Sequence, residues 1–310
     1  MESLKESKVL KYHPDTLQAI RKMYGLNQPV AMSDAIDILQ EWIKKQDHFM
    51  KKDFDRDFLE RLILHAKGSI ERSKQRLDKM CTSKTLTPSF FTKFNVQELA
   101  LQAIEDAPLP RLTQDHYRVY LLRNIGQKFD DEFSTNYHKR LICSMEYVSK
   151  NDYFVGVIMV LDFRKTNLVA LLRNLSLVEL QQVLTMIMEC YGYRIKAIHM
   201  LSTSKLIETL VSAFKQFLSA KVGSRIHVHS TIESLHEHIE TDILPREYGG
   251  NEKSLSELHK QWLEVISSEE HMEYMNMMRA AGTNESFRRA EKYNEQILGM
   301  PGSFRALRVD

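Results

Sequence analysis

The most constraining feature of this sequence is an almost unbroken apolar run, FVGVIMVLDF, at Phe154–Phe163. A strand of this composition is typical of the centre of a parallel sheet, where both faces are buried. Two more strand-like runs follow at Arg194–Leu201 and Arg225–His229, and helical patterns at Leu177–Tyr191 and Lys205–Ala220 separate the three. This alternation of strands and helices predicts an α/β fold with a mainly parallel sheet and right-handed crossovers.

The first third of the chain has a helical pattern instead, from about Asp15 to Gln102. Apolar residues recur at helical spacing in several segments, and Ser33 and Asp34 are expected to cap one of them. Two further helical segments are predicted at Phe58–Leu64 and Ile70–Met80. The chain therefore begins with a helical module that differs in kind from the region of strands.

Prolines mark the boundary between these regions. Thr87-Pro88 is expected to end the last helix of the module. The run Ala107–Pro110 contains two prolines, which remove backbone donors and favour an extended path, so a linker is predicted there. A short strand at Tyr117–Leu122 and a helix at about Ser134–Ser149 follow.

Charge and cysteine content exclude several classes of protein. Lys and Arg number 43 against 41 for Asp and Glu, a net charge of +2, so no nucleic-acid partner is expected. Three widely spaced cysteines suit a reducing, cytoplasmic setting. The N-terminus has no apolar segment of a signal peptide, and the longest apolar runs, such as Val155–Leu161, are too short to span a bilayer.

No catalytic or cofactor motif emerges from the sequence. A glycine-rich phosphate loop and a GxSxG elbow are both absent, so we expect neither an enzyme nor a bound cofactor. His227 and His229 share one strand face, and His236 and His238 lie nearby in the sequence. This pattern suits either a metal site or an ordinary solvated edge of the sheet. Asp162, at the end of the buried strand, is either catalytic or a turn cap, and the cap is favoured.

The helix at Lys205–Ala220 has a wide apolar stripe. Its interpretation is open between an ordinary crossover helix packed on the sheet and a lid over a ligand cavity. Cations flank the helix on both sides, and they are either ordinary solvated charge or a site for a phosphorylated headgroup or anionic membrane. These cations are Arg194, Lys196, Lys221 and Arg225.

Four segments resemble the CRAL-TRIO lipid-binding family. The strongest is Ile243–Gly250 (ILPREYGG), which is similar to the family's LPxEYGG signature. The others are RIKAIH at residues 194–199, FLSAK at 217–221 and RIHVH at 225–229. The resemblance covers roughly residues 30–270. It implies an N-terminal helical module at 1–105, a lipid-binding domain at 106–270 and a peripheral helix and tail at 271–310.

In that fold the sheet forms the floor of an apolar cavity, and the helix at Lys205–Ala220 is a movable gate. The resemblance places the ligand against floor and wall positions, and the apolar stripe adds gate positions. The floor is Val157, Met159 and Leu161, which share one face of their strand. The wall is Tyr137, Ser144, Leu168, Leu172, Met186, Ile187, Tyr191 and Ile198, and the gate residues are Leu206, Leu210, Val211 and Phe214.

The resemblance also assigns phosphoinositide binding to Arg194, Lys196, Lys221 and Arg225. The sequence departs from the family at Leu64–Gly68, where one arginine of that site is missing. We therefore predict a cytoplasmic, monomeric protein that carries one hydrophobic molecule, such as a tocopherol, retinoid or carotenoid, between membranes. It would visit membranes transiently and release its cargo at anionic phosphoinositide lipid. The alternative is a phosphoinositide-binding scaffold whose cavity is structural.

Overall fold

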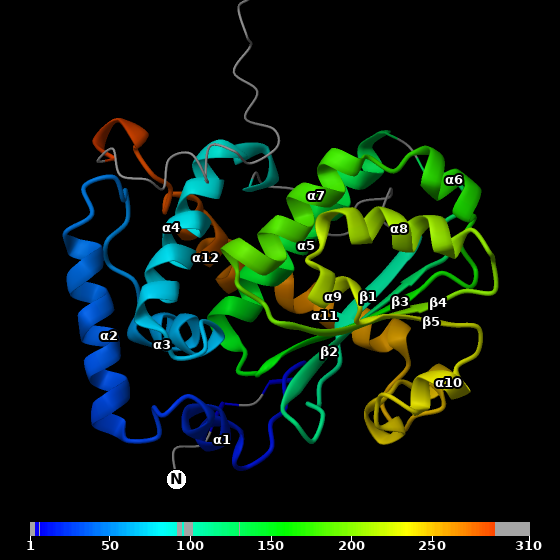
Figure 1. Ribbon diagram of the computed structural model, residues 1–310, viewed down its shortest axis with the longest axis horizontal. Coiled ribbons are helices and arrows are strands. Elements are labelled where there is room, and N and C mark those ends of the chain that lie inside the picture. The colour runs from blue at the N-terminus through cyan, green and yellow to red at the C-terminus, as the bar shows by residue number, and fades with distance from the viewer. Residues whose placement is uncertain (1–3, 6, 92–94, 96–101, 130, 289–310) are drawn as a thin grey trace, which may run out of the picture.

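The computed structural model describes residues 4–5, 7–91, 95, 102–129 and 131–288. It has a helical module beside a domain built on a five-stranded sheet (Figure 1). The module consists of α1 (Thr16–Met23), α2 (Pro29–Lys44), α3 (Arg56–His65), α4 (Ile70–Leu86) and a 3-10 turn, η1 (Pro88–Phe91).

The prediction that Ser33 and Asp34 cap a helix is wrong. The helix α2 begins a turn earlier, with Pro29 in its first turn and Gln28 as its N-cap. Proline suits that position because its φ angle is already helical and the missing N–H has no partner there. The predicted break at Thr87-Pro88 is confirmed, since α4 ends at Leu86.

The sheet order is β1-β2-β3-β4-β5, with β1 antiparallel to β2 and all other neighbours parallel. The predicted central strand is confirmed as the middle of this sheet. Its bounds and those of its neighbours are β1 (Ile104–Pro108), β2 (Tyr117–Asn124), β3 (Gly156–Asp162), β4 (Ile195–Leu201) and β5 (Ile226–His229).

The predicted linker at Ala107–Pro110 is wrong in its first half. Ala107 and Pro108 end the edge strand β1, and Ala107 is buried. An edge strand tolerates proline because one side of its backbone has no neighbour to receive a hydrogen bond. The prolines therefore mark the end of a strand and not a free connection.

Helices α5, α7 and α8 lie over one face of the sheet, α10 lies toward the other side, and α11 packs along the edge strand β1 and contacts α5 (Figure 1). The helix predicted at Leu177–Tyr191 changes to a π-helix at its end, and the one predicted at Lys205–Ala220 is interrupted at Leu218, where the backbone is extended. The bounds are α5 (Asp131–Asn151), α6 (Leu168–Arg173), α7 (Leu177–Thr185), the π-helix η3 (Met186–Cys190), α8 (Ile207–Phe217), α9 (Ala220–Gly223) and α10 (Glu233–His236).

The segment at Ile243–Gly250 ties the far side of the sheet to the end of β3. The Tyr248 hydroxyl donates a 2.8 Å hydrogen bond to Asp162 Oδ2, and Gly249 has a φ of 78°, which favours glycine. Gly250 leaves no room for a side chain, because a Cβ there would lie 1.9 Å from the Leu244 carbonyl oxygen. Asp162 also accepts from the backbone N–H of Arg164 at 3.0 Å, so it is the turn cap that the sequence favours.

The remaining elements are the 3-10 turns η4 (Thr241–Ile243), η5 (Arg246–Tyr248) and η6 (Glu285–Phe287), with α11 (Leu255–Ile266) and α12 (Glu269–Arg279). The peripheral C-terminal helix predicted beyond residue 270 corresponds to α12. The extended tail predicted after it falls mostly at 289–310, outside the described residues. Within the described part of the chain, no helix combines the length and apolarity needed to cross a bilayer.

Candidate functional site

A cavity of about 160 Å³ lies between the sheet, α5, α7 and α8. Met159 and Leu161 of β3 form its floor, and Leu210 and Phe214 of α8 close it from above. Every second residue of β3 faces this space because side chains alternate across a strand. The apolar run that predicts the central strand therefore also supplies the floor of the cavity, through the side chains on one face of β3.

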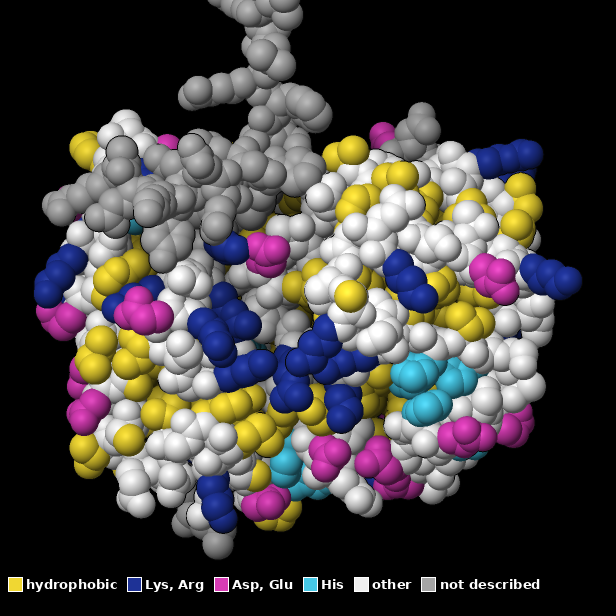
Figure 2. Space-filling view, in the orientation of Figure 1, with side chains coloured by type: hydrophobic (Ala, Val, Ile, Leu, Met, Phe, Trp, Pro, Cys, Tyr) yellow, Lys and Arg dark blue, Asp and Glu magenta, His cyan; other side chains and the backbone are white. Residues whose placement is uncertain are grey.

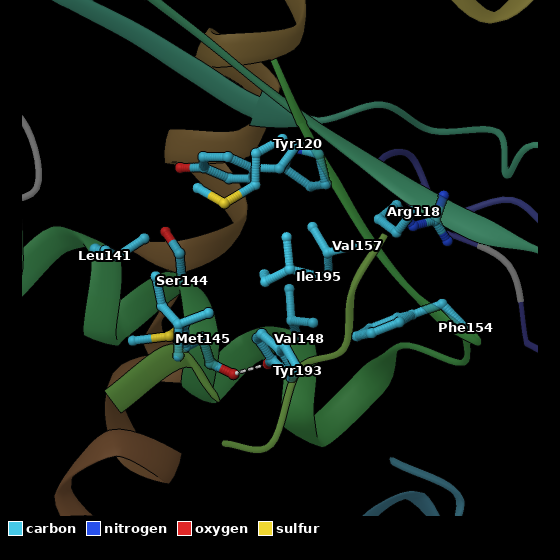
Figure 3. A pocket seen from close by; sticks show the side chains of 13 residues that line it. Arg118, Tyr120, Leu141, Ser144, Met145, Val148, Phe154, Val157, Tyr193 and Ile195 are labelled. Atoms are coloured by element: carbon cyan, nitrogen blue, oxygen red, sulfur yellow. Dashed lines mark hydrogen bonds between the residues drawn. The ribbon is translucent and has the colours of Figure 1, made fainter. Parts of the chain in front are cut away.

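A second cavity of about 60 Å³ continues toward the start of β3 (Figure 3). Ser144, Met145 and Val148 of α5 face Val157 and Ile195 of the sheet across it. The Tyr193 hydroxyl donates to the Met145 carbonyl oxygen at 3.0 Å and closes one side (Figure 3). Four side chains line both spaces, which makes the two cavities neighbouring lobes: Tyr120, Leu141, Met159 and Ile187.

The structure brings some of the predicted wall residues together and leaves others elsewhere. Those that line one or both lobes are Tyr137, Ser144, Val157, Met159, Leu161, Ile187, Leu210 and Phe214. Those that line neither lobe are Leu168, Leu172, Met186, Tyr191, Ile198, Leu206 and Val211. Their role as ligand contacts stays a prediction.

Two of the residues outside the lobes have evident other surroundings. Leu206 is 38% exposed at the start of α8. The buried Tyr191 donates from its hydroxyl to Glu146 Oε1 at 2.9 Å, beside the Lys84–Glu146 ion pair of 2.7 Å. The position of a residue along an apolar helix does not show which side of the apolar stripe borders the cavity. Two residues close in the sequence can therefore differ, one lining a lobe and the other lying outside it.

Several lining residues were not anticipated. The larger lobe is also bounded by apolar side chains that come mostly from α5, α6 and α7 and the connections between them. The sequence signal that could have identified most of them is the apolar pattern of the helix that Ser176 caps. That pattern predicts that one face of the helix is buried, but it does not show what the face packs against. These residues include Phe133, Leu171, Leu175, Leu180, Val183 and Leu184.

Polar groups are few at the cavity walls. The Tyr120 hydroxyl donates to Asp106, which also forms an ion pair with Arg140 at 2.8 Å. Burial raises the pKa of the Tyr137 hydroxyl far above its usual range. Burial lowers the pKa of His138, so its imidazole is neutral at neutral pH. A largely apolar box with isolated polar groups suits a hydrophobic molecule.

The predicted basic residues gather on one face, together with cations from the helical module (Figure 2). Arg194 and Lys196 lie over the Tyr117 ring, 5.9 and 5.1 Å from its centroid. Arg225 donates from Nη1 to the Ile195 carbonyl oxygen at 2.7 Å. We call this group, with Lys221 and the module cations described next, the basic cluster.

The module contributes Lys67, Arg72 and Arg76 to the basic cluster. Partial burial lowers the pKa of Lys67, and repulsion from Arg194, Arg72, Lys221 and Arg76 lowers it further. Like charges this close favour an anion among them. Lys67 lies in the segment Leu64–Gly68, where the resemblance predicts a missing arginine, and the fold brings it close to two of the predicted cations, Arg194 and Lys221.

Arg76 occupies an unusual place beside Gly192. Burial lowers the pKa of its guanidinium to about 10, and its Nη1 atom is buried without a hydrogen-bond partner. Gly192 has a φ of 71°, and a Cβ there would lie 2.4 Å from Arg76 Cζ. The glycine therefore makes room for the arginine at the edge of the basic cluster.

The histidines considered as a metal site lie on the opposite face of the sheet from the cavity. His227 and His229 pack with His199 of β4 and with His238, with ring centroids 4.9–5.5 Å apart. His236 is turned away and bonds the Tyr248 carbonyl oxygen at 2.8 Å. Among the described residues, no group of three or more potential ligands is arranged to hold a metal ion.

The fold and the cavity define an α/β protein with an N-terminal helical module and an apolar chamber between the sheet and α8. The sequence matches the model of the CRAL/TRIO domain over residues 108–250. This match, which covers a little under half of the chain, identifies residues 108–250 as a CRAL/TRIO domain.

Curated relatives agree with this assignment. The chain is 22% identical to mouse alpha-tocopherol transfer protein-like over 227 residues, which cover 69% of this chain and 64% of that protein. It is 32% identical to the human protein of the same name over 71 residues, which cover 23% and 21%. These matches span less than two thirds of either relative. The crystal structure of Sfh5 has the same fold, with a TM-score of 0.52 at 13% identity, covering 84% of this chain and 96% of that one.

Proposed function

We propose that this protein carries one hydrophobic molecule in the two-lobed cavity and transfers it between membranes. The observation that carries the proposal is the apolar chamber between β3 and α8, closed by Leu210 and Phe214. Burying several hundred Å² of apolar surface contributes roughly 25 cal/mol per Å², which is enough to hold a lipid out of water. A carrier needs no catalytic group, and we propose that the protein is not an enzyme.

Loading requires the gate to move. The larger lobe measures about 160 Å³, whereas sites for small organic ligands usually occupy about 300–1,000 Å³. Outward displacement of α8 would enlarge the chamber from the side that Leu210 and Phe214 now close. The extended residue Leu218, between α8 and α9, interrupts the helix and supplies a place for such a hinge.

In this proposal the cargo is released at an anionic membrane, where phosphoinositide headgroups bind to the basic cluster. Lys221 lies on α9, directly after the gate helix, and Arg225 precedes β5. Anionic lipid that binds these side chains would favour the state in which the gate is displaced. The protein is then cytoplasmic and monomeric, with transient membrane contact.

The test is transfer of a bound lipid to vesicles. Lys221→Ala with Arg225→Ala should slow transfer to vesicles that contain phosphoinositide and leave cargo affinity nearly unchanged. Substituting Lys44 and Lys45 of the module by Ala provides a control with the same change of net charge. Equal loss of transfer and of affinity would count against the mechanism, as would equal transfer rates for the two double variants.

A phosphoinositide-binding scaffold is the second candidate, and the small volume of the chamber favours it. Native mass spectrometry of the purified full chain separates the two functions. One equivalent of an apolar molecule supports the carrier. A chain that never retains a cargo, even after incubation with lipid extract, supports the scaffold.

A further inference from the structure

One buried polar atom on the wall of the larger lobe and another beside the lobe have no hydrogen-bond partner. His138, on α5, is 6% exposed and lines the cavity, and its Nδ1 atom has no partner. Glu179, in the first turn of α7, has the same deficit at Oε2; its side chain is 26% exposed and lies beside the lobe, next to the lining residue Leu180. The two atoms lie 3.9 Å apart, which is too far for a direct hydrogen bond.

This arrangement is costly unless something lies between the two atoms. A buried polar group without a partner costs about 1–3 kcal/mol, and more when it is charged. An oxygen about 2.8 Å from each atom would meet ordinary hydrogen-bond lengths to both. The second oxygen of Glu179, Oε1, already accepts a hydrogen bond from the Thr135 hydroxyl at 3.5 Å.

We propose that the cargo carries a hydroxyl group that binds between His138 and Glu179. This proposal rests on the carrier function and names the chemical class of its cargo. The hydroxyl donates to Glu179 Oε2 and accepts from the N–H of His138, so one oxygen satisfies both atoms. The hydrocarbon part of the same molecule extends along Met159 and Phe214, which line the same lobe.

Other polar ends fit the pair less well. An ether or ester oxygen accepts but does not donate, so it leaves Glu179 without a partner. A carboxylate brings a second negative charge next to Glu179, and His138 does not offset it because burial keeps the imidazole neutral. The lobe therefore selects an alcohol or phenol over an ether, an ester or a fatty acid.

The experiment compares three probes of equal chain length: 1-hexadecanol, its methyl ether and hexadecanoate. Each probe displaces a fluorescent apolar dye from the full chain in metal-free buffer. We expect the alcohol to bind at least tenfold more tightly than the ether. In His138→Phe, which retains an aromatic ring beside Phe90, the preference should vanish. In Glu179→Gln, hexadecanoate should gain affinity relative to the alcohol.

Glu208→Gln, on the gate helix but outside the lining residues, is the matched control and should keep the wild-type preference. Equal affinities of alcohol and ether for the wild-type chain would overturn the proposal, since an ordered water would then satisfy the pair. Bound dye that none of the probes displaces would also overturn it and leave the carrier function standing. A dye that binds Met159→Arg as tightly as the wild-type chain would instead overturn the carrier function.

Discussion

The Nδ1 atom of His199 lies 2.9 Å from the Nε2 atom of His229 in the outer face of the sheet. Burial, and then repulsion from His229, His227 and His238, lowers the pKa of His199 to about 3. Burial and repulsion from His238 lower the pKa of His227. Burial and repulsion from His238 and His227 lower the pKa of His229, and Glu237 opposes that shift. The contact between His199 and His229 is therefore one between neutral rings.

Acid should weaken this contact. A histidine whose pKa is lower in the folded chain stabilises the fold fully above its unfolded pKa of about 6.5, and this contribution falls as pH decreases toward the folded value. For His199 the loss is about 1.4 kcal/mol per pH unit below pH 6. Urea unfolding at pH 7.5 and 5.0 measures it. His199→Leu should flatten the dependence, and His13→Gln, outside the cluster, should not.

The buried ion pair between Lys84 and Glu146 predicts a large effect on stability. Both side chains are 1% exposed, and the Tyr191 hydroxyl also donates to Glu146. Lys84→Met leaves the carboxylate buried without its partner charge and should cost about 3–5 kcal/mol. Lys79→Met removes the exposed pair with Glu189 from the same helix and should cost less than about 1 kcal/mol. Similar losses in urea unfolding would contradict the prediction.

The two sides of α8 should differ in their effect on cargo. Phe214 lines the cavity, whereas Val211 does not. Phe214→Ala removes apolar contact with the cargo and should weaken binding by about 1.5–3 kcal/mol, roughly 10- to 100-fold. Val211→Ala should change affinity only slightly. Dye binding measures both affinities, and equal losses would contradict the prediction.

A charge in the floor should abolish binding. Met159 lies between the two lobes and lines both. Met159→Arg places an unpaired cation in an apolar chamber, which is strongly unfavourable both for the cargo and for the empty cavity. Met159→Leu keeps the volume and is the control. Circular dichroism confirms that the variant folds, and normal cargo binding by folded Met159→Arg would place the ligand elsewhere.

The module cations should contribute to membrane binding. Lys67→Gln with Arg76→Gln removes two charges of the basic cluster and should weaken binding to anionic vesicles by about 1 kcal/mol per charge near the surface, roughly 30-fold together. The control, Lys74→Gln with Lys79→Gln, removes charges from ion pairs with Glu71 and Glu189. Vesicle co-sedimentation at increasing salt measures the difference. A larger loss in the control would contradict it.

Local patterns were sufficient for most of the elements. The apolar run at Phe154–Phe163 identified β3, and Ser176 marked the start of α7, where its side chain accepts from the backbone N–H of Glu179. Both signals act between residues close in sequence. The prediction of a linker at Ala107–Pro110 was wrong because a proline shows only that a backbone N–H is missing. That no N–H is needed there follows from the position of β1 at the edge of the sheet.

The sequence by itself determined the α/β class, the helical module and the family, because periodicity and the ILPREYGG segment are properties of neighbouring residues. The tertiary structure alone decided which side of each apolar stripe borders the chamber, since packing orients Phe214 and Val211 differently on one helix. It also brought Lys67 and Arg76 to the basic cluster, and His138 within 3.9 Å of Glu179. Contacts between distant parts of the chain depend on how whole elements pack, and no local pattern encodes them.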